Sequence, residues 1–246
     1  MSRARLAFLS EAGAELLKAV RAPEFLLPTL LMPVAFYSLF AIVLPGSRAN
    51  AAYLLATFGV FAVMGPAIFG FGVAVATERE RGWLDIKRAS PASGLAYIGA
   101  KLAATVVFAS LALVLIYAIA GFVGGVAMPR SVWASLLVVH LVGAVPFALI
   151  GLTLGFSLNA NGAIAVTNVI FLALAALGGL WIPMVVMPPT MQTFAQFLPS
   201  YHMAELALAV ANTAGDRPVW FHVSVISVMT ALLTASALWA WRRQNG

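Results

Sequence analysis

The sequence predicts an all-α membrane protein with six transmembrane helices, and three observations support this fold class. Of the 246 residues, 63% are hydrophobic and 9% are charged, and the mean hydropathy is +1.00. A soluble domain is about 45–50% apolar and about 25% charged, so this chain lacks the polar residues to cover a water-facing globule. Its apolar residues gather in long runs, and about 20 such residues cross a bilayer as a helix. Residues 1–246 are expected to form a single transmembrane domain.

The composition also limits the chemistry. The chain contains no cysteine, which excludes disulfides, thiolate metal sites and cysteine nucleophiles. A sequence pI of 10.2 would suggest nucleic acid as the partner of a soluble protein. Here the basic residues flank apolar runs, which fits membrane topology, so no nucleic-acid partner is expected. Glu11, Glu15 and Lys18 interrupt the first 20 residues, so no cleavable signal peptide is expected.

Residues 1–22 are predicted to form an amphipathic helix on the membrane surface. Apolar side chains recur there at helical spacing: Leu6, Leu9, Leu16, Leu17 and Val20. Glu11, Glu15 and Lys18 lie on another face. A helix with these two faces lies in the interface plane. The alternative is a solvated extension of the first span.

Six apolar segments are predicted to span the membrane: 24–45, 52–77, 94–125, 132–157, 163–181 and 219–241. Residues 182–212, before the last span, are apolar but interrupted by Pro183, Pro188, Pro189 and Pro199. Backbone at membrane depth needs internal hydrogen bonds or a protein-lined cavity. We expect two short helices there, near 190–198 and 200–212, that re-enter the outer leaflet.

The basic residues predict the orientation. With a cytoplasmic N-terminus, eleven of the 14 lysines and arginines fall in inner segments, and Arg48, Arg130 and Arg217 fall outside. This excess is the positive-inside bias. Both termini are therefore expected in the cytoplasm of a multi-pass protein of the cell inner (plasma) membrane.

Residues 77–93 are unusually charged for a connection between two spans. They hold seven of the chain's acidic and basic residues (14 Lys and Arg, eight Asp and Glu). Thr77 and Glu80 have capping-box spacing, and Ser90 before Pro91 resembles a helix start. We expect a short cytoplasmic helix over about 80–89, whose charges surround Trp83, Leu84 and Ile86. The pattern fits a contact patch for a protein partner and equally a solvated connector.

Few ionisable residues lie in or near the predicted spans, where such groups are costly. Glu24 at a helix start, Lys101 near the inner headgroups and His140 bonded to a neighbouring helix all have structural interpretations. His202 and Glu205 are expected either to contact substrate or to hold the broken segment together. Close helix contacts are expected at Gly121 with Gly125 and at Gly151 with Gly155.

Two motifs resemble those of a known family. The run Glu78-Arg79-Glu80-Arg81-Gly82, followed by Ser90-Pro91, Tyr97 and Lys101, resembles the first cytoplasmic loop of ABC-2 type permeases. These are the membrane subunits of type V ABC transporters, a bacterial exporter family. Trp83 stands where threonine is common. The run from Gly179 through Tyr201-His202 resembles the family's broken outer segment, so the resemblance covers nearly the whole chain.

The resemblance implies a role without catalysis. Such permeases act in pairs with two ATPase chains, and this chain has no Gly-x-x-x-x-Gly-Lys-Ser/Thr loop. We expect ATP and Mg on a separate ATPase and no catalytic, cofactor or metal site in this chain. A coupling helix at 78–89 would dock on the ATPase through Glu78, Arg79, Glu80, Arg81, Gly82, Asp85, Lys87 and Arg88. The segment 182–212 would form an outer gate with Pro183, Pro188, Pro189, Tyr201, His202 and Glu205.

The sequence thus predicts the permease of an ATP-driven exporter for a hydrophobic, drug-like or lipid-linked substrate. Its expected partners are a cytoplasmic ABC ATPase, a second permease chain, more often identical than different, and membrane lipid. An intramembrane protease is disfavoured because Ser157 and His140 lie at opposite ends of one span. An ion-coupled secondary transporter is disfavoured because the acids lie at span ends and no inverted repeat is visible. A non-transporting sensor or immunity protein on the same scaffold stays open.

Overall fold

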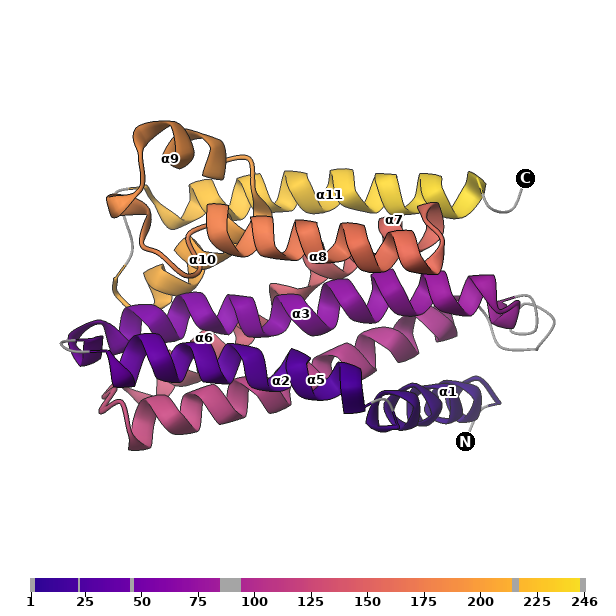
Figure 1. Ribbon diagram of the computed structural model, residues 1–246, viewed down its shortest axis with the longest axis horizontal. Coiled ribbons are helices and arrows are strands. Elements are labelled where there is room, and N and C mark those ends of the chain that lie inside the picture. Colours follow the sequence, from indigo (N-terminus) through magenta and orange to yellow (C-terminus); the bar gives the residue numbers. More distant parts are fainter. Residues whose placement is uncertain (1–2, 22, 45–46, 85–93, 214–216, 244–246) are drawn as a thin grey trace.

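The computed structural model describes the chain except residues 1–2, 22, 45–46, 85–93, 214–216 and 244–246. The elements in the described ranges are all helical (Figure 1). Their bounds are α1 Arg3–Val20, α2 Pro23–Ser38, η1 Leu39–Val43, η2 Ser47–Asn50, α3 Ala51–Glu80, α5 Gly94–Phe122, α6 Arg130–Val142, α7 Ala144–Ser157, α8 Ala160–Leu177, η3 Met184–Val186, α9 Pro189–Ala195, α10 Pro199–Val210 and α11 Val219–Arg243. The all-α prediction is thus confirmed for the described residues.

Five helical stretches in the described residues are long and apolar enough to cross a membrane. They are Ala51–Glu80, Tyr97–Phe122, Arg130–Ser157, Ala160–Leu177 and Val219–Arg243. Each lies close to one of the predicted spans. Within the first predicted span, 24–45, the apolar helix found in the described residues is the shorter stretch Thr29–Val43. The expected count of six is therefore not confirmed.

The first segment is nevertheless helical along α2 and η1, although Pro33 lies inside α2. After Ser38 the helix widens into the π-helical turn η1, where the N–H of Leu44 donates to the carbonyl of Leu39 at 3.1 Å. The chain therefore runs as a helix from Pro23 to Val43.

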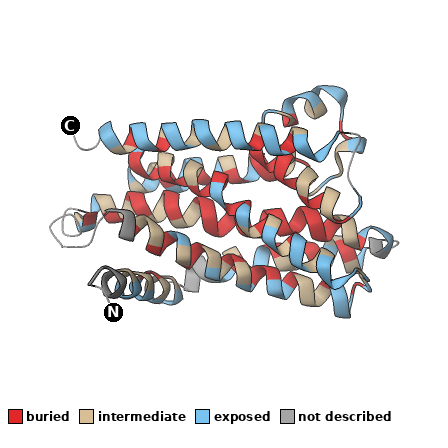
Figure 2. Cartoon of the chain, turned by 180° about the vertical axis from the view of Figure 1, so that it is seen from behind, coloured by how far each residue is buried: buried red, intermediate tan, exposed pale blue. Residues whose placement is uncertain are grey.

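α3 is the central helix of the bundle. In its most apolar stretch 78% of the residues are buried, against 11% in α11. Figure 2 shows the buried residues gathered along the middle of the bundle, with the C-terminal helix exposed along much of its length. α7 approaches α3 closely at Gly151 and Gly155, whose missing side chains leave room for the α3 backbone. Of the two predicted glycine pairs, Gly151 with Gly155 makes this contact, whereas an added Cβ at Gly121 or Gly125 would meet nothing within 4 Å.

The ends of the bundle differ in their elements. Figure 1 shows α1, the end of α3 and the C-terminus at one end, and α9 with the start of α10 at the other. α9 and α10 match the two short helices expected within 182–212. Each begins with proline, which lacks an N–H and is pre-set for the first helical turn.

We expect Gly151→Ala to lower the free energy of unfolding by about 1–3 kcal/mol through overpacking. An added Cβ would lie 2.5 Å from the carbonyl oxygen of Ile68, so α3 would have to shift. Gly121→Ala is the matched control and should be neutral or mildly stabilising, because its surroundings are open. Thermal unfolding of the two variants in the same detergent measures the difference. Equal shifts would contradict the close approach of α3 and α7.

Candidate functional site

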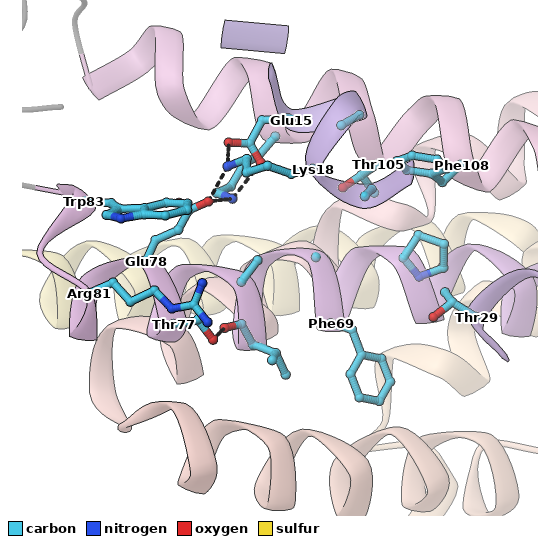
Figure 3. Close-up of a pocket in the computed structure, with 17 residues that line it drawn as sticks. Glu15, Lys18, Thr29, Phe69, Thr77, Glu78, Arg81, Trp83, Thr105 and Phe108 are labelled. Carbon is cyan, nitrogen blue, oxygen red and sulfur yellow. Dashed lines mark hydrogen bonds and ion pairs between the residues drawn. The ribbon is translucent and has the colours of Figure 1, made fainter. Parts of the chain in front are cut away.

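Five ionisable or hydroxyl side chains from three helices meet where α3 ends. Glu15 and Lys18 come from α1, Glu78 from the last turn of α3, and Tyr97 and Lys101 from α5. Figure 3 shows Glu15, Lys18 and Glu78 pointing toward one another across the space between these helices. We call these five residues the ionic cluster. It joins helices through pairs of residues that lie 19 to 86 positions apart in the chain.

Each lysine of the ionic cluster pairs with both of its carboxylates. Lys101 Nζ lies 2.9 Å from Glu15 Oε2 and 3.1 Å from Glu78 Oε1. Lys18 pairs with the same two carboxylates. The Tyr97 hydroxyl donates to Glu78 Oε2 at 2.6 Å. Each ammonium therefore bridges α1 to α3, and the cluster as a whole attaches α1 to both α3 and α5.

Burial makes these ion pairs important for the position of α1. Glu15, Glu78, Tyr97 and Lys101 are all buried, and Lys101 is only 3% exposed. A lone buried charge is very costly, whereas two carboxylates facing two ammonium groups are neutral together. Burial raises the pKa of the Glu15 carboxyl, but Lys101 and Lys18 outweigh this and hold it below 4.5. Burial lowers the pKa of Lys18, but Glu78 and Glu15 outweigh this and hold it above 10.5. Both groups therefore stay charged at neutral pH.

The next two residues of α3 contact the other side of the bundle. Arg79 donates to the carbonyl oxygens of Phe156 and, at 2.6 Å, Leu158, at the end of α7. Glu80 accepts the N–H of Ala160, the first residue of α8, at 3.1 Å. A cation at a helix C-terminus and an anion at a helix N-terminus both complement the helix dipole. The last turn of α3 is thus attached to α1 and α5 on one side and to the α7–α8 turn on the other.

The chain leaves α3 at Arg81 and turns at Gly82, whose φ of +72° favours glycine. Trp83 and Leu84 are helical again. Arg81 and Trp83 are both exposed, and the guanidinium carbon lies 5.7 Å from the centre of the indole ring. The expected coupling helix at 78–89 therefore has different bounds: residues 78–80 are the last turn of α3. Asp85, Lys87 and Arg88 lie outside the described residues.

The predicted outer-gate residues lie at the opposite end. Pro183 precedes η3, and Pro188 and Pro189 begin α9. Tyr201, His202 and Glu205 lie on α10, where His202 is buried and the other two are half-buried.

His202 is bonded within this outer segment and to α11. Its Nε2 lies 2.9 Å from the Gln196 carbonyl, so it donates there, and its Nδ1 lies 3.0 Å from Nδ1 of His222. The Ser200 hydroxyl also donates to the Leu174 carbonyl of α8 at 2.8 Å. Of the two roles expected for His202, these contacts fit the one of holding the segment together.

His140 and Lys101 illustrate how the membrane-embedded polar groups are satisfied. His140 Nε2 donates to the Ala56 carbonyl at 2.9 Å, and the Tyr117 hydroxyl donates to Nδ1 at 2.9 Å. This is the expected bonding to neighbouring helices. Lys101, by contrast, was expected to reach the inner headgroups. Its ammonium is instead buried in the ionic cluster, because it pairs there with the carboxylates of Glu15 and Glu78.

Sequence reasoning found part of the ionic cluster. Glu78, Tyr97 and Lys101 belong to the quoted motif, but Glu15 and Lys18 were interpreted only as the polar face of a surface helix. The signal was available, since Glu15 and Lys18, an acid and a base three residues apart, lie on the same side of one helix. His222 was not singled out. Among the described residues, no group of three or more His, Cys, Asp or Glu could hold a metal ion.

The apolar bundle with its paired charges at one end defines a multi-pass helical membrane protein. The family model described as ABC-2 type transporter matches residues 8–212. The chain is also similar to the "Putative transport permease YvfS" of Bacillus subtilis strain 168, with 31% identity over 236 residues that cover 94% of this chain and 96% of that protein. The chain therefore belongs to the ABC-2 type transporter family, and the resemblance drawn from its two motifs is confirmed. Membership implies a transport permease that pairs with an ABC ATPase subunit.

Lys101→Met should lower the free energy of unfolding by about 3–5 kcal/mol, because it leaves two buried carboxylates with one ammonium between them. The control is Arg243→Met, at an exposed position at the end of α11, and it should lower the free energy of unfolding far less. Adding Glu78→Gln to Lys101→Met should recover part of the loss, because one unpaired charge is removed. Thermal unfolding in detergent compares these proteins with wild type and with the single variant Glu78→Gln, and strict additivity of the two cluster mutations would refute the direct coupling.

Acid should release α1 from the bundle. Since the folded pKa of Glu15 lies below 4.5, its contribution to docking is complete above pH 4.5 and is lost as the pH falls below it. The contribution of Lys18 is complete below pH 10.5 and is lost only above it. The cysteine-free chain allows spin labels at Leu17→Cys on α1 and Val107→Cys on α5, both exposed. Their pulsed-EPR distance distribution should be narrow at neutral pH and broaden below pH 4.5. In Glu15→Gln it should be broad already at neutral pH, and a narrow one there would contradict the assignment.

Proposed function

We propose that the chain is the membrane-spanning subunit of an ATP-driven exporter. A separate cytoplasmic ATPase would bind ATP and Mg and act through the segment that follows α3. The observation that carries this proposal is the attachment of the last turn of α3 to α1, α5 and the α7–α8 turn. A partner that displaces this turn would displace four other helices with it.

The contacts divide the predicted coupling residues into two groups. Glu78 is buried and Arg79 bonds the α7–α8 turn, so these two transmit a displacement within the permease. Arg81 and Trp83 are exposed and stand where the chain leaves the bundle, so these would contact the ATPase. Glu80 belongs to both groups, because it is exposed and also accepts the N–H of Ala160. Trp83 is an aromatic side chain beside charged ones, and aromatic residues are enriched at the centre of protein interfaces. Asp85, Lys87 and Arg88 remain proposed members of the same contact.

The energy for transport would come from a difference between two states of the ATPase. A partner shifts a conformational equilibrium only by its differential affinity for the two states. If closure of the ATPase moves the exposed segment, the ionic cluster carries α1 and α5 along as a rigid group. The bundle would then change its packing, and the segment 182–212 would act as the outer gate, with the His202–His222 contact between α10 and α11 as one point where it opens.

The remaining features of the proposal follow the family. The permease would act as a dimer, more often of two identical chains, in the inner membrane, with both termini in the cytoplasm. The apolar interior suits a hydrophobic, drug-like or lipid-linked substrate, with membrane lipid as the surrounding partner.

The double variant Glu80→Ala, Arg81→Ala should insert normally but lose ATPase coupling. Both side chains are exposed, so stability should change by less than about 1 kcal/mol. The matched control is Arg242→Ala, Arg243→Ala, which removes charge from exposed positions at the same end of the bundle (Figure 1). Co-purification with the ATPase, and ATP turnover of the reconstituted complex, should fall at least about tenfold in the first variant only. Unchanged co-purification and turnover would refute the docking assignment.

A further inference from the structure

A cavity of about 450 Å³ lies beside the ionic cluster, between α1, α2, α3 and α5. Its volume falls within the about 300–1,000 Å³ of small-molecule sites. Figure 3 shows side chains from these helices around it, with Glu15, Lys18 and Glu78 at one end and Thr29 and Phe108 at the other. The proposed coupling mechanism uses residues at the charged end of this cavity, among them Glu78 and Arg81, but assigns nothing to the space itself.

The cavity wall is divided by polarity. Its body is lined mainly by apolar groups such as Pro66, Phe69, Val73 and Phe108. Among the described residues, its charged lining consists of Lys18, Arg81 and Lys101 with Glu15 and Glu78, three cations against two carboxylates. Because the two ammonium groups balance the two carboxylates within the ionic cluster, the excess positive charge belongs to Arg81, which is exposed. The charged end thus favours an anion and the body favours an apolar group.

The length of the cavity matches one leaflet. From Pro66 to Glu78 the lining of α3 covers 12 helical steps, or about 18 Å at 1.5 Å per residue. Half of a hydrocarbon core is about 15 Å, and the headgroup layer adds the remainder. Trp83 lines the cavity at its charged end, and tryptophan is enriched at headgroup depth. A molecule in this cavity would therefore lie along α3 with one end among headgroups and the other among acyl chains.

We propose that this cavity binds an anionic phospholipid of the surrounding membrane. The phosphate lies beside Arg81 and Lys18, and an acyl chain lies along α3 toward Phe69 and Phe108. Basic pockets between transmembrane helices on the cytoplasmic side are suited to such headgroups. A neutral apolar molecule would leave the cationic end unmatched, and a soluble anion would leave the apolar body unfilled.

The bound lipid would stabilise the docked position of α1. Lys18 and Ala19 contribute α1 to the cavity wall, so the lipid contacts α1, α3 and α5 at once. It therefore binds the arrangement in which the ionic cluster is intact better than one in which α1 has left. The binding itself does not depend on the exporter assignment, and its test needs no ATPase and no transport.

Gly70→Leu tests the cavity. Gly70 lines it, and an added Cβ would meet only the Thr105 hydroxyl oxygen at 3.6 Å, so the larger side chain fills the cavity without striking backbone. Gly121→Leu is the matched control, since position 121 is also on a helix, has open surroundings and is not part of the cavity. Native mass spectrometry of the purified full chain, exposed to equal phosphatidylglycerol and phosphatidylcholine, counts the lipid retained. Wild type and Gly121→Leu should prefer phosphatidylglycerol about tenfold, and Gly70→Leu should lose that binding.

Arg81→Gln tests the charge. It should abolish the preference for phosphatidylglycerol while leaving the protein folded, since Arg81 is exposed. Arg243→Gln is the control, because Arg243 likewise lies over a tryptophan, Trp239, at 5.4 Å, but is no part of the cavity. Its preference should match that of wild type.

Three results would overturn the proposal. One is undiminished phosphatidylglycerol retention in Gly70→Leu. Another is equal retention of the two lipids by wild type, which would mean that an apolar groove accepts any lipid. The third is displacement of the lipid by glycerol phosphate alone, which would assign the site to a soluble anion. If Gly70→Leu fails to fold, the Arg81→Gln pair still decides between the outcomes.

Discussion

The position of α1 depends on the pairing of Glu15 and Glu78 with Lys101. Each of these three side chains is buried, and none could be buried alone without losing its charge or its helix contact. A surface helix held only by apolar residues slides freely along the interface, whereas one held by a buried ion pair has a fixed register. The exposed Leu9 and Leu17 leave α1 an apolar face for lipid, so lipid contact and ion pairing act on the same helix.

Helix geometry explains how one turn of α3 reaches two sides of the bundle. Successive residues of a helix are rotated by about 100°, so Glu78, Arg79 and Glu80 cannot face the same neighbour. Glu78 faces α1 and α5, while Arg79 and Glu80 contact the end of α7 and the start of α8. The alternating charges of Glu78, Arg79 and Glu80 therefore connect α3 with α1, α5, α7 and α8. A loop of the same composition placed further from the bundle would have no such contacts.

Much of the fold could be predicted from the sequence, and less of the site. Apolar runs predicted the long helices because lipid forces the backbone to bond within each helix. For the first predicted span, the apolar helix within the described residues is the shorter stretch Thr29–Val43. The motif identified Glu78 and Lys101, but Glu15, the other partner of Lys101, lies near the start of the sequence, and no local pattern specifies a contact across 86 positions. Such a pairing becomes visible only when three helices are placed together.

The ionic cluster and the lipid cavity share Glu15, Lys18, Glu78 and Lys101, and this has a thermodynamic consequence. A ligand that binds the docked arrangement of α1 and a partner that displaces the end of α3 act on the same equilibrium. Each then changes the affinity of the other by the same factor, since coupling between two sites is reciprocal. An anionic lipid beside Lys18 would oppose any ATPase state that separates α1 from α3 and favour any state that keeps them joined. The lipid composition of the membrane would thereby change the free energy that the ATPase must supply to separate α1 from α3.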